Sequence, residues 1–294
     1  MRFSLWVWPP VLLVMLTMSA FPEKTPNRVA LVIGNANYAD SSMPVPTTIG
    51  DAKTLAEELD RLDFNVSLKT NVGSREMQRS IDAFVDKLDT GMTALFYFAG
   101  FGLQIARQTY LIPVDAEIWS ESDVRRNGIS MEAVLTKMHR KRAKTKIVIL
   151  DAARRNPFER RFRAVAVGLA ALNAPEGTLA IFAVRPGAVV RDRIGANSLF
   201  MSELIKELRV PDRTAEEAFS AARVGVSRAS NNEQVPWVTS SLLEAFSFEQ
   251  PGPVLMEPIP SPSPTPAQQT HSAPSSSPDP TAPASIETAR IIPR

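Results

Sequence analysis

The chain has 294 residues, of which 44% are apolar, and its formal net charge is +2. This length and apolar content allow one large folded domain or two small ones, and the near-neutral charge gives no support for a nucleic-acid partner. The chain contains no cysteine and only two histidines. Disulfides, thiolate nucleophiles and cysteine-ligated metal sites are therefore excluded, little histidine chemistry remains, and we expect no cofactor.

Residues 1–20 have the layout of a secretory signal peptide. One arginine is followed by an apolar stretch with two prolines and then by the small residues Ser19–Ala20. We therefore expect an exported protein, periplasmic or secreted, whose mature chain starts near Phe21. The alternative is an uncleaved inner-membrane anchor, because Met18 is bulky at the third position before a cut after residue 20.

From residue 27 to 250, apolar strands alternate with amphipathic helices. The sequence predicts strands at 28–34 (RVALVIG), 64–70, 92–98 (MTALFYF), 109–116, 145–151 (TKIVILD) and 177–184, the fourth as a strand or a sheet edge. It predicts helices at 50–62, 74–89, 130–143, 197–209 and 214–230, with Ser74 as the N-cap of the second. This alternation predicts an α/β fold with a mostly parallel sheet that is covered by helices on both faces.

Residues 251–294 form a tail of different composition. They hold 12 of the 24 prolines, with Ser, Thr, Ala and Gln between them and no periodic apolar face. Such a segment cannot bury enough surface to offset its ordering entropy, so it is predicted to be disordered and to serve as a spacer or tether. Docking of its PxxP-like pieces is the alternative.

Three predicted strands end in marked loops, which read GNANY (34–38), AGFGLQ (99–104) and DAARRNPF (151–158). None has the glycine spacing of a nucleotide-binding loop, so a dinucleotide site is not expected. Phe101 stands between two glycines at a strand end, where α/β proteins usually carry polar binding residues. The simpler explanation is that Phe101 folds back onto the core.

Six blocks in order resemble one family. They read RVALVIGNANY, GDAKTLAEELDRLDFNV, ALFYFAGFGLQ, TYLIPVDA, VILDAARRNPF and GTLAIFAVRPG. Together they are similar to bacterial caspase-like proteins of the metacaspase and peptidase C14 type, from Arg28 to about Phe248. The resemblance implies a caspase–hemoglobinase-like three-layer sandwich over 27–250.

The resemblance also implies a cysteine–histidine dyad, and this chain lacks it. The histidine position, between the two glycines, is Phe101, and the cysteine position is Ala153. Cysteine proteolysis needs a thiolate and a nearby base, and neither side chain supplies one. We therefore predict no cysteine-peptidase activity.

No other residue pair is an obvious replacement for the dyad. His139 lies in a basic predicted helix and His271 lies in the tail. Ser130 and Ser198 precede predicted helices and are better explained as helix caps.

In metacaspase-like enzymes two acids form a pocket for a basic side chain, and the matching residues here are Asp51 and Asp151. Two carboxylates in one pocket favour a Lys or Arg, so a basic peptide segment is the predicted ligand. The structural alternatives are that Asp51 caps a helix starting at Ala52 and that Asp151 holds its own loop. Arg185 is expected to fill the pocket if the site is closed.

The segment after Ala153 is rich in arginine and reads ARRNPFERRFR. A solvated surface is the ordinary explanation, and contact with anionic lipid headgroups or an acidic partner is the sharper one, which the basic stretch 139–146 would extend. The arginines are Arg154, Arg155, Arg160, Arg161 and Arg163.

The sequence thus predicts an exported caspase-like pseudoenzyme that acts as a binding or regulatory module. Two rivals stay open at this point. One is a cell-envelope scaffold with a vestigial cleft, and the other is a hydrolase with an unrecognised non-cysteine dyad.

Overall fold

The computed structural model describes residues 27–249 except 40–42, 44, 164–165 and 191–194. The predicted signal segment and the predicted disordered tail, including His271, lie outside these residues. Within the described part of the chain, no helix is both long enough and apolar enough to cross a membrane.

A six-stranded sheet in the order β2-β1-β3-β7-β8-β9 forms the centre of the fold. Its first five strands are parallel, and β9 runs antiparallel to β8 at one edge. The predicted parallel sheet is thus confirmed, whereas the edge strand β9 was not predicted. The strands are β1 (Arg28–Gly34), β2 (Asn65–Thr70), β3 (Thr93–Ala99), β7 (Thr145–Asp151), β8 (Thr178–Phe182) and β9 (Trp237–Ser240).

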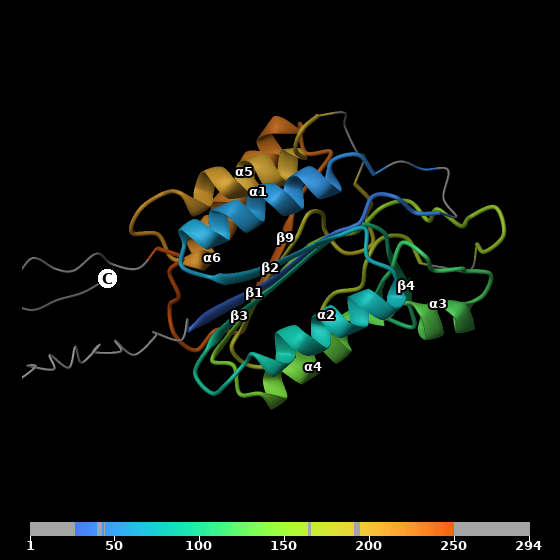
Figure 1. The fold of residues 1–294 in the computed structure, drawn as a ribbon. Helices are drawn as coiled ribbons and strands as arrows, with labels where there is room; N and C mark the ends of the chain where they lie inside the picture. The colour runs from blue at the N-terminus through green and yellow to red at the C-terminus, as the bar shows by residue number, and fades with distance from the viewer. Residues whose placement is uncertain (1–26, 40–42, 44, 164–165, 191–194, 250–294) are drawn as a thin grey trace, which may run out of the picture. The chain divides into compact units, whose positions relative to one another are not determined.

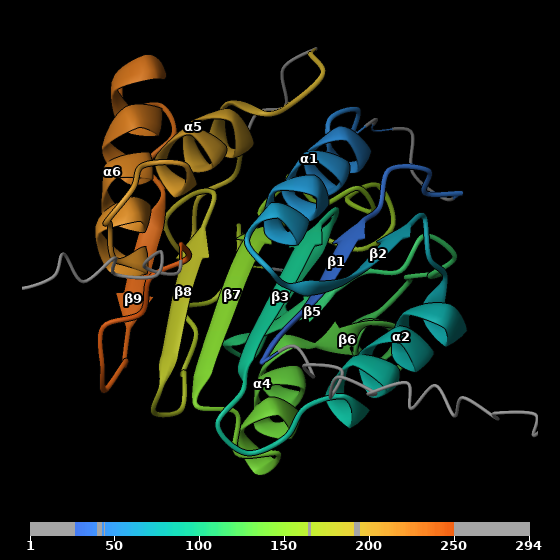
Figure 2. The ribbon, with the colours of Figure 1, turned by 60° about the vertical axis from the view of Figure 1, so that its left-hand side comes forward.

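Helices cover both faces of this sheet, as Figures 1 and 2 show. One layer contains α1 (Thr48–Arg61), α5 (Leu199–Leu208) and α6 (Ala215–Ala229), and the other contains α2 (Ser74–Asp86) and α4 (Met131–Arg140). The predicted three-layer α/β architecture is therefore present. The predicted start of α2 at residue 74 is confirmed, but the predicted N-cap was wrong: Gly73 is the N-cap, and the Ser74 amide donates to Asp115 Oδ1 (2.7 Å).

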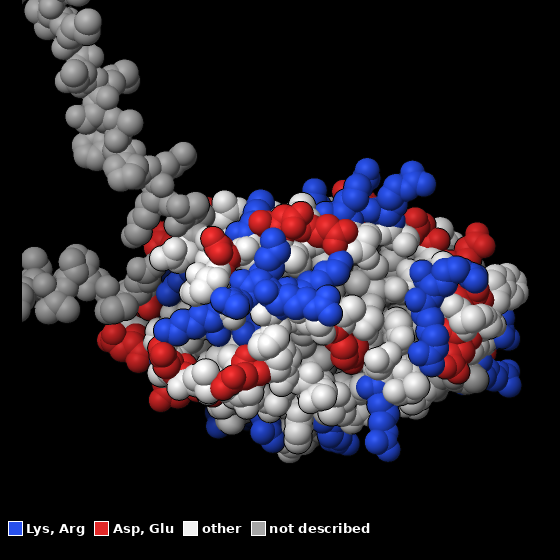
Figure 3. Space-filling model, turned by 90° about the horizontal axis from the view of Figure 1, so that it is seen from below, with Lys and Arg blue, Asp and Glu red and all other residues white. Residues whose placement is uncertain are grey.

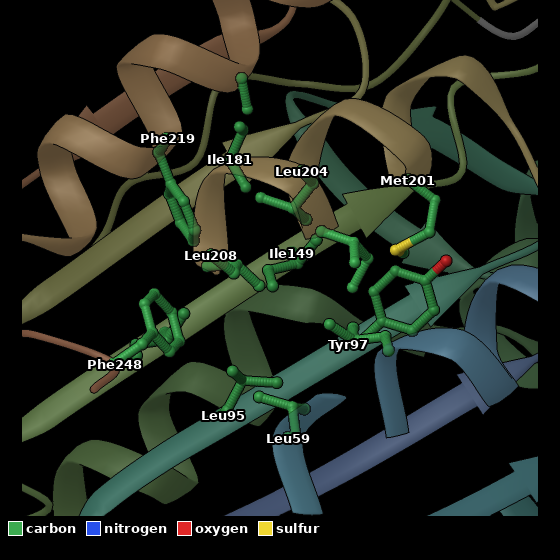
Figure 4. Packing of buried hydrophobic residues seen from close by; sticks show 14 of the residues in the cluster. Leu59, Leu95, Tyr97, Ile149, Ile181, Met201, Leu204, Leu208, Phe219 and Phe248 are labelled. Atoms are coloured by element: carbon green, nitrogen blue, oxygen red, sulfur yellow. The ribbon is translucent and has the colours of Figure 1, made fainter. Parts of the chain in front are cut away.

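Both faces of the sheet are apolar because each strand alternates its side chains between two helical layers. In β3, Leu95 and Tyr97 pack under α1, α5 and α6, and Figure 4 shows Tyr97 beside Met201. Phe96 and Phe98 point to the α2 and α4 layer. Burial on both sides explains why these strands read as unbroken apolar runs.

A small antiparallel sheet, β4-β5-β6, occupies the excursion between β3 and α4. Its strands are β4 (Gly102–Ile105), β5 (Gln108–Leu111) and β6 (Ile129–Ser130), and the short helix α3 (Glu121–Asn127) lies between the last two. Of these elements only β5 overlaps a predicted strand. The small sheet supports a third apolar cluster, and this cluster contains Phe101.

Candidate functional site

The loops after β3 and β7 lie side by side at the carboxyl edge of the central sheet. The two strands are paired in parallel as far as Ala99 and Asp151. Beyond them the Gly102 amide donates to the carbonyl of Ala152 (2.8 Å). The structure therefore brings together the two turns that carry Phe101 and Ala153, as expected for parallel strands that end at one edge.

Phe101 is a core residue. Its side chain is 1% exposed, and its ring centroid lies 4.6 Å from that of Tyr38. The Phe101 amide donates to Tyr38 Oη (2.8 Å), and the Phe101 carbonyl accepts from the amide of Ile112 (2.9 Å). The simpler explanation, that Phe101 folds back onto the core, is confirmed.

The two glycines that flank Phe101 are required by close backbone approach. A Cβ atom on Gly100 would lie 2.3 Å from Tyr38 Oη, and one on Gly102 would lie 2.7 Å from Leu169 Cδ2. Neither glycine adopts a positive φ, so backbone conformation is not the reason for glycine at these positions. The Gly-Phe-Gly turn is thus fixed by packing between the strand ends.

Ala153 is also enclosed. It is 4% exposed, belongs to the apolar cluster on the α2 and α4 side, and its carbonyl accepts from the amide of Val190 (2.7 Å). The two positions predicted for the dyad thus carry apolar side chains that solvent hardly reaches.

The two predicted pocket acids lie close together, and a third side chain joins them. Asp51 is 0% exposed in the first turn of α1, and Asp151 is 1% exposed at the end of β7. Arg154 is 3% exposed, and its guanidinium lies 3.2 Å (Nη1–Oδ1) and 3.3 Å (Nη2–Oδ2) from the Asp151 carboxylate. Arg154 also donates to the carbonyls of Asp151 and Gly100, the latter at 3.0 Å. A buried arginine therefore neutralises this acid and connects the two turns.

Asp51 is held differently from Asp151. One of its oxygens accepts the amide of Ser198 (2.8 Å), and the other has no hydrogen-bond partner among the described residues. Burial first, and then the nearby charge of Asp151, raises the pKa of Asp51 to about 7 against the opposing effects of Ser198 and Arg154. Burial and the same two acids also raise the pKa of Tyr97.

Two structural predictions about this cluster were wrong. Asp51 does not cap its own helix, because α1 begins at Thr48, and its carboxylate instead binds the start of α5. Arg185 is exposed, so the arginine at the acids is Arg154. Arg154 was placed by sequence in a charged surface loop, and only its position three residues after Asp151 could have indicated the pairing.

The other polar candidates have ordinary structural roles. Ser130 and Ser198 cap α4 and α5 by accepting amides three residues further on, as predicted. His139 is exposed near the end of α4, which precedes the start of β7, whereas the dyad positions follow strand ends. In the described ranges no three His, Asp or Glu side chains approach closely enough to hold a metal ion.

The five arginines after Asp151 do not form one surface. Arg154 is buried, and Arg161 stacks on Trp119 (4.3 Å to the ring centroid) while its Nε donates to the carbonyl of Ile118 (2.6 Å). The arginines that stay exposed are Arg155, Arg160 and Arg163.

Comparison with known proteins agrees with this architecture. The sequence profile of the peptidase C14 family, described as the caspase domain, matches residues 27–247. The chain belongs to the caspase-domain family. The human mucosa-associated lymphoid tissue lymphoma translocation protein 1 is 31% identical over 134 residues, and its mouse homologue is 30% identical over 134 residues. These matches cover 45% of this chain and 16% of either relative, so the chain spans a small part of their length.

A solved structure shows the same caspase-domain fold. The Drosophila initiator caspase Dronc aligns with a TM-score of 0.54 at 13% identity, over 76% of this chain and 84% of that one. At this low identity, the likeness shows a shared fold alone.

Proposed function

We propose that this caspase-domain protein is catalytically silent and acts by binding. The observation that carries the proposal is the pair of side chains at the two adjoining turns, Phe101 and Ala153, in a chain with no cysteine. Neither side chain can act as a nucleophile or move a proton. The hydroxyl of Tyr38, which lies beside Phe101, accepts the Phe101 amide and donates to the carbonyl of Ile112 (3.1 Å).

The test is an assay with reporter peptides that contain Arg, Lys or Asp, with calcium supplied. We expect no turnover above a heat-inactivated sample of the same protein. Turnover that co-purifies with the chain and disappears on heating would overturn the proposal and favour the rival hydrolase with a non-cysteine dyad.

A second candidate function is recognition of a basic side chain by Asp51 and Asp151. It is favoured by the Asp51 oxygen without a partner among the described residues. Against it, Arg154 already lies at Asp151, and the burial of both acids requires an incoming side chain to displace protein atoms. A scaffold role for the domain follows if the acids serve only Arg154.

Titration of an Arg-containing peptide separates these possibilities. Binding to the wild type that is lost in Asp151→Asn supports basic side-chain recognition. Binding seen only in Arg154→Ala means that the pocket is filled by its own arginine, and Arg185→Ala is the matched control because that side chain is exposed. Absence of binding in every variant supports the scaffold role.

We also propose that the protein is exported, on the strength of the signal-like residues 1–20. Cell fractionation tests this. Mature protein starting near Phe21 outside the cytoplasm is the expected result, full-length protein in the inner membrane supports an anchor, and full-length cytosolic protein contradicts export.

A further inference from the structure

A groove lies beside the two adjoining turns, on the solvent side of the arginine-rich loop. One part is a hollow of about 270 Å³ whose lining includes Gly102, Leu103 and Val167. A second hollow, of about 460 Å³, shares Arg155, Asn156, Glu159 and Arg163 with the first and adds Arg160. Because the hollows share these side chains, they adjoin one another, and we call the two together the arginine groove.

The arginine groove is positively charged. It contains three exposed arginines and one acid, Glu159. Arg155 pairs with Glu159 (2.7 Å), which leaves Arg160 and Arg163 without a carboxylate partner among the described residues. Arg163 uses its Nε to donate to the carbonyl of Glu159 (3.3 Å), and its Nη groups and the Arg160 guanidinium remain available for an external anion.

The loop that carries these arginines is anchored from beneath. Phe158 and Phe162 are 2% and 6% exposed and belong to the same apolar cluster as Phe101. Asn156 braces the turn, because its Oδ1 accepts the Phe158 amide (2.9 Å) and its Nδ2 donates to the carbonyl of Phe162 (2.6 Å). An anchored loop presents its arginines with little loss of freedom on binding.

The groove also has apolar surface. Its lining includes the buried Leu103 and Val167, which is 63% exposed. Guanidinium groups beside an apolar side chain complement an extended peptide in which acidic and apolar residues alternate. We propose that the arginine groove binds an acidic peptide segment of a partner protein. This inference rests on the proposed function, namely that the domain works by binding.

A lipid surface fits the groove less well than a peptide. The arginines line a depression rather than a flat face. The face that carries α2 and α4 is not a basic surface either, because it mixes basic and acidic side chains (Figure 3). On that face Lys137 pairs with Asp82 (2.7 Å) and Lys141 with Asp86 (3.6 Å). The basic stretch 139–146 does not extend the groove. It ends in the first residues of β7, whereas the arginine loop follows the last residue of this seven-residue strand. The two segments are therefore separated by the length of the strand, roughly 20 Å.

The experiment measures the anisotropy of a rhodamine-labelled nonapeptide of alternating Glu and Leu, titrated with the full chain. Counterparts with Gln or Lys in place of Glu test the charge requirement. The test variant is Arg160→Gln/Arg163→Gln, and the matched control is Arg140→Gln/Arg142→Gln, which removes two exposed arginines at the other end of β7. Vesicles with and without phosphatidylglycerol are tested by co-sedimentation.

We expect the Glu peptide alone to bind, about ten-fold more weakly in the test variant and unchanged in the control variant. Its affinity falls with added salt. Because the mutated side chains are exposed, the melting temperature of both variants stays at the wild-type value.

Three results would overturn the inference: no binding of the Glu peptide, equal binding by wild type and test variant, or an equal loss in both variants. Binding of phosphatidylglycerol vesicles without peptide binding would also overturn it, in favour of a lipid surface. None of these results bears on the proposed catalytic silence, which only reporter-peptide turnover contradicts.

Discussion

Two regions at the same edge of the central sheet differ in the chemistry of their buried side chains. The dyad turns are apolar and closed, with Phe101 and Ala153 packed into separate clusters. The neighbouring acid cluster, which consists of Asp51, Asp151 and Arg154, has three ionisable side chains, all nearly inaccessible to solvent. Arg154 connects the regions, since it binds the carboxylate of Asp151 and the carbonyl of Gly100. The difference indicates that the ionisable side chains at this edge hold the two turns together.

The largest effect that tests this comparison is expected for Arg154→Ala. Removing the guanidinium leaves Asp151 buried without its counter-ion and takes a donor from Gly100, which costs about 3–5 kcal/mol of unfolding free energy. Urea denaturation measures it. Arg155→Ala is the matched control, because that side chain is exposed, and it should cost less than about 1 kcal/mol. Equal losses in both variants would mean that the acid cluster does not stabilise the turns.

The next effect concerns pH and Asp51. Its pKa is raised to about 7 in the folded protein, against about 4 in the unfolded chain, so the folded state holds the proton more tightly. The resulting stability is present below pH 4 and is lost as the pH rises through 7.

Relative to Asp51→Asn, the wild type should therefore lose about 2–4 kcal/mol between pH 4 and pH 8. Urea denaturation across this range measures the difference. Asp60→Asn, an exposed position on the same helix, should follow the wild type. Parallel curves for wild type and Asp51→Asn would show that the Asp51 carboxyl is not perturbed.

Phe101→His tests the other side of the comparison. It places a base at the position that the family resemblance assigns to the histidine, but its imidazole nitrogens enter an apolar cluster, with an expected cost of about 1–3 kcal/mol. Phe101→Leu, which keeps the site apolar, should cost less. The double variant Phe101→His/Ala153→Cys should show no turnover of reporter peptides. Turnover at full stability would show that the closed turns are permissive for chemistry.

The smallest energetic effect is expected for Ala153→Cys, below about 1.5 kcal/mol. Because the chain has no cysteine, the introduced thiol is the sole thiol, and its reaction with a thiol reagent reports access to this position directly. We expect slow labelling in the folded protein. Arg155→Cys, two residues further on and exposed, should label rapidly, and equal rates would contradict the closed site.

Sequence reasoning performed well where burial is complete on both sides of an element. β7 was predicted with its observed ends, because a parallel strand between two helical layers is an unbroken apolar run. β9 was missed, since this short edge strand has exposed residues at both ends and its pattern is weak. β4 and β6 were missed because they are short. β4 has four residues and forms a hairpin with β5 across the turn Ala106–Arg107. β6 has two residues, and its Ser130 pairs with Tyr110 of β5, so neither strand is long enough to leave a periodic signal.

At the site, sequence located residues better than it assigned their contacts. The family resemblance placed Phe101, Ala153, Asp51 and Asp151 at one edge, and the structure brings them there. The direction of Arg154 was not predictable, because its acceptor Gly100 lies 54 residues earlier in the chain. A run of arginines indicates a solvated surface, and only the folded turns reveal that one of them is enclosed.

The glycines around Phe101 determine what a motif search in this family can detect. Neither position has room for a Cβ atom, because Tyr38 Oη lies against Gly100 and Leu169 Cδ2 lies against Gly102. Both contacts are packing contacts. A chain with a phenyl ring between these glycines therefore has the same packing reason to have glycine at both positions as a chain with a histidine there. A match to the two glycines of this motif thus indicates only that the two turns pack together. The residue between the glycines must be identified separately before an activity is assigned.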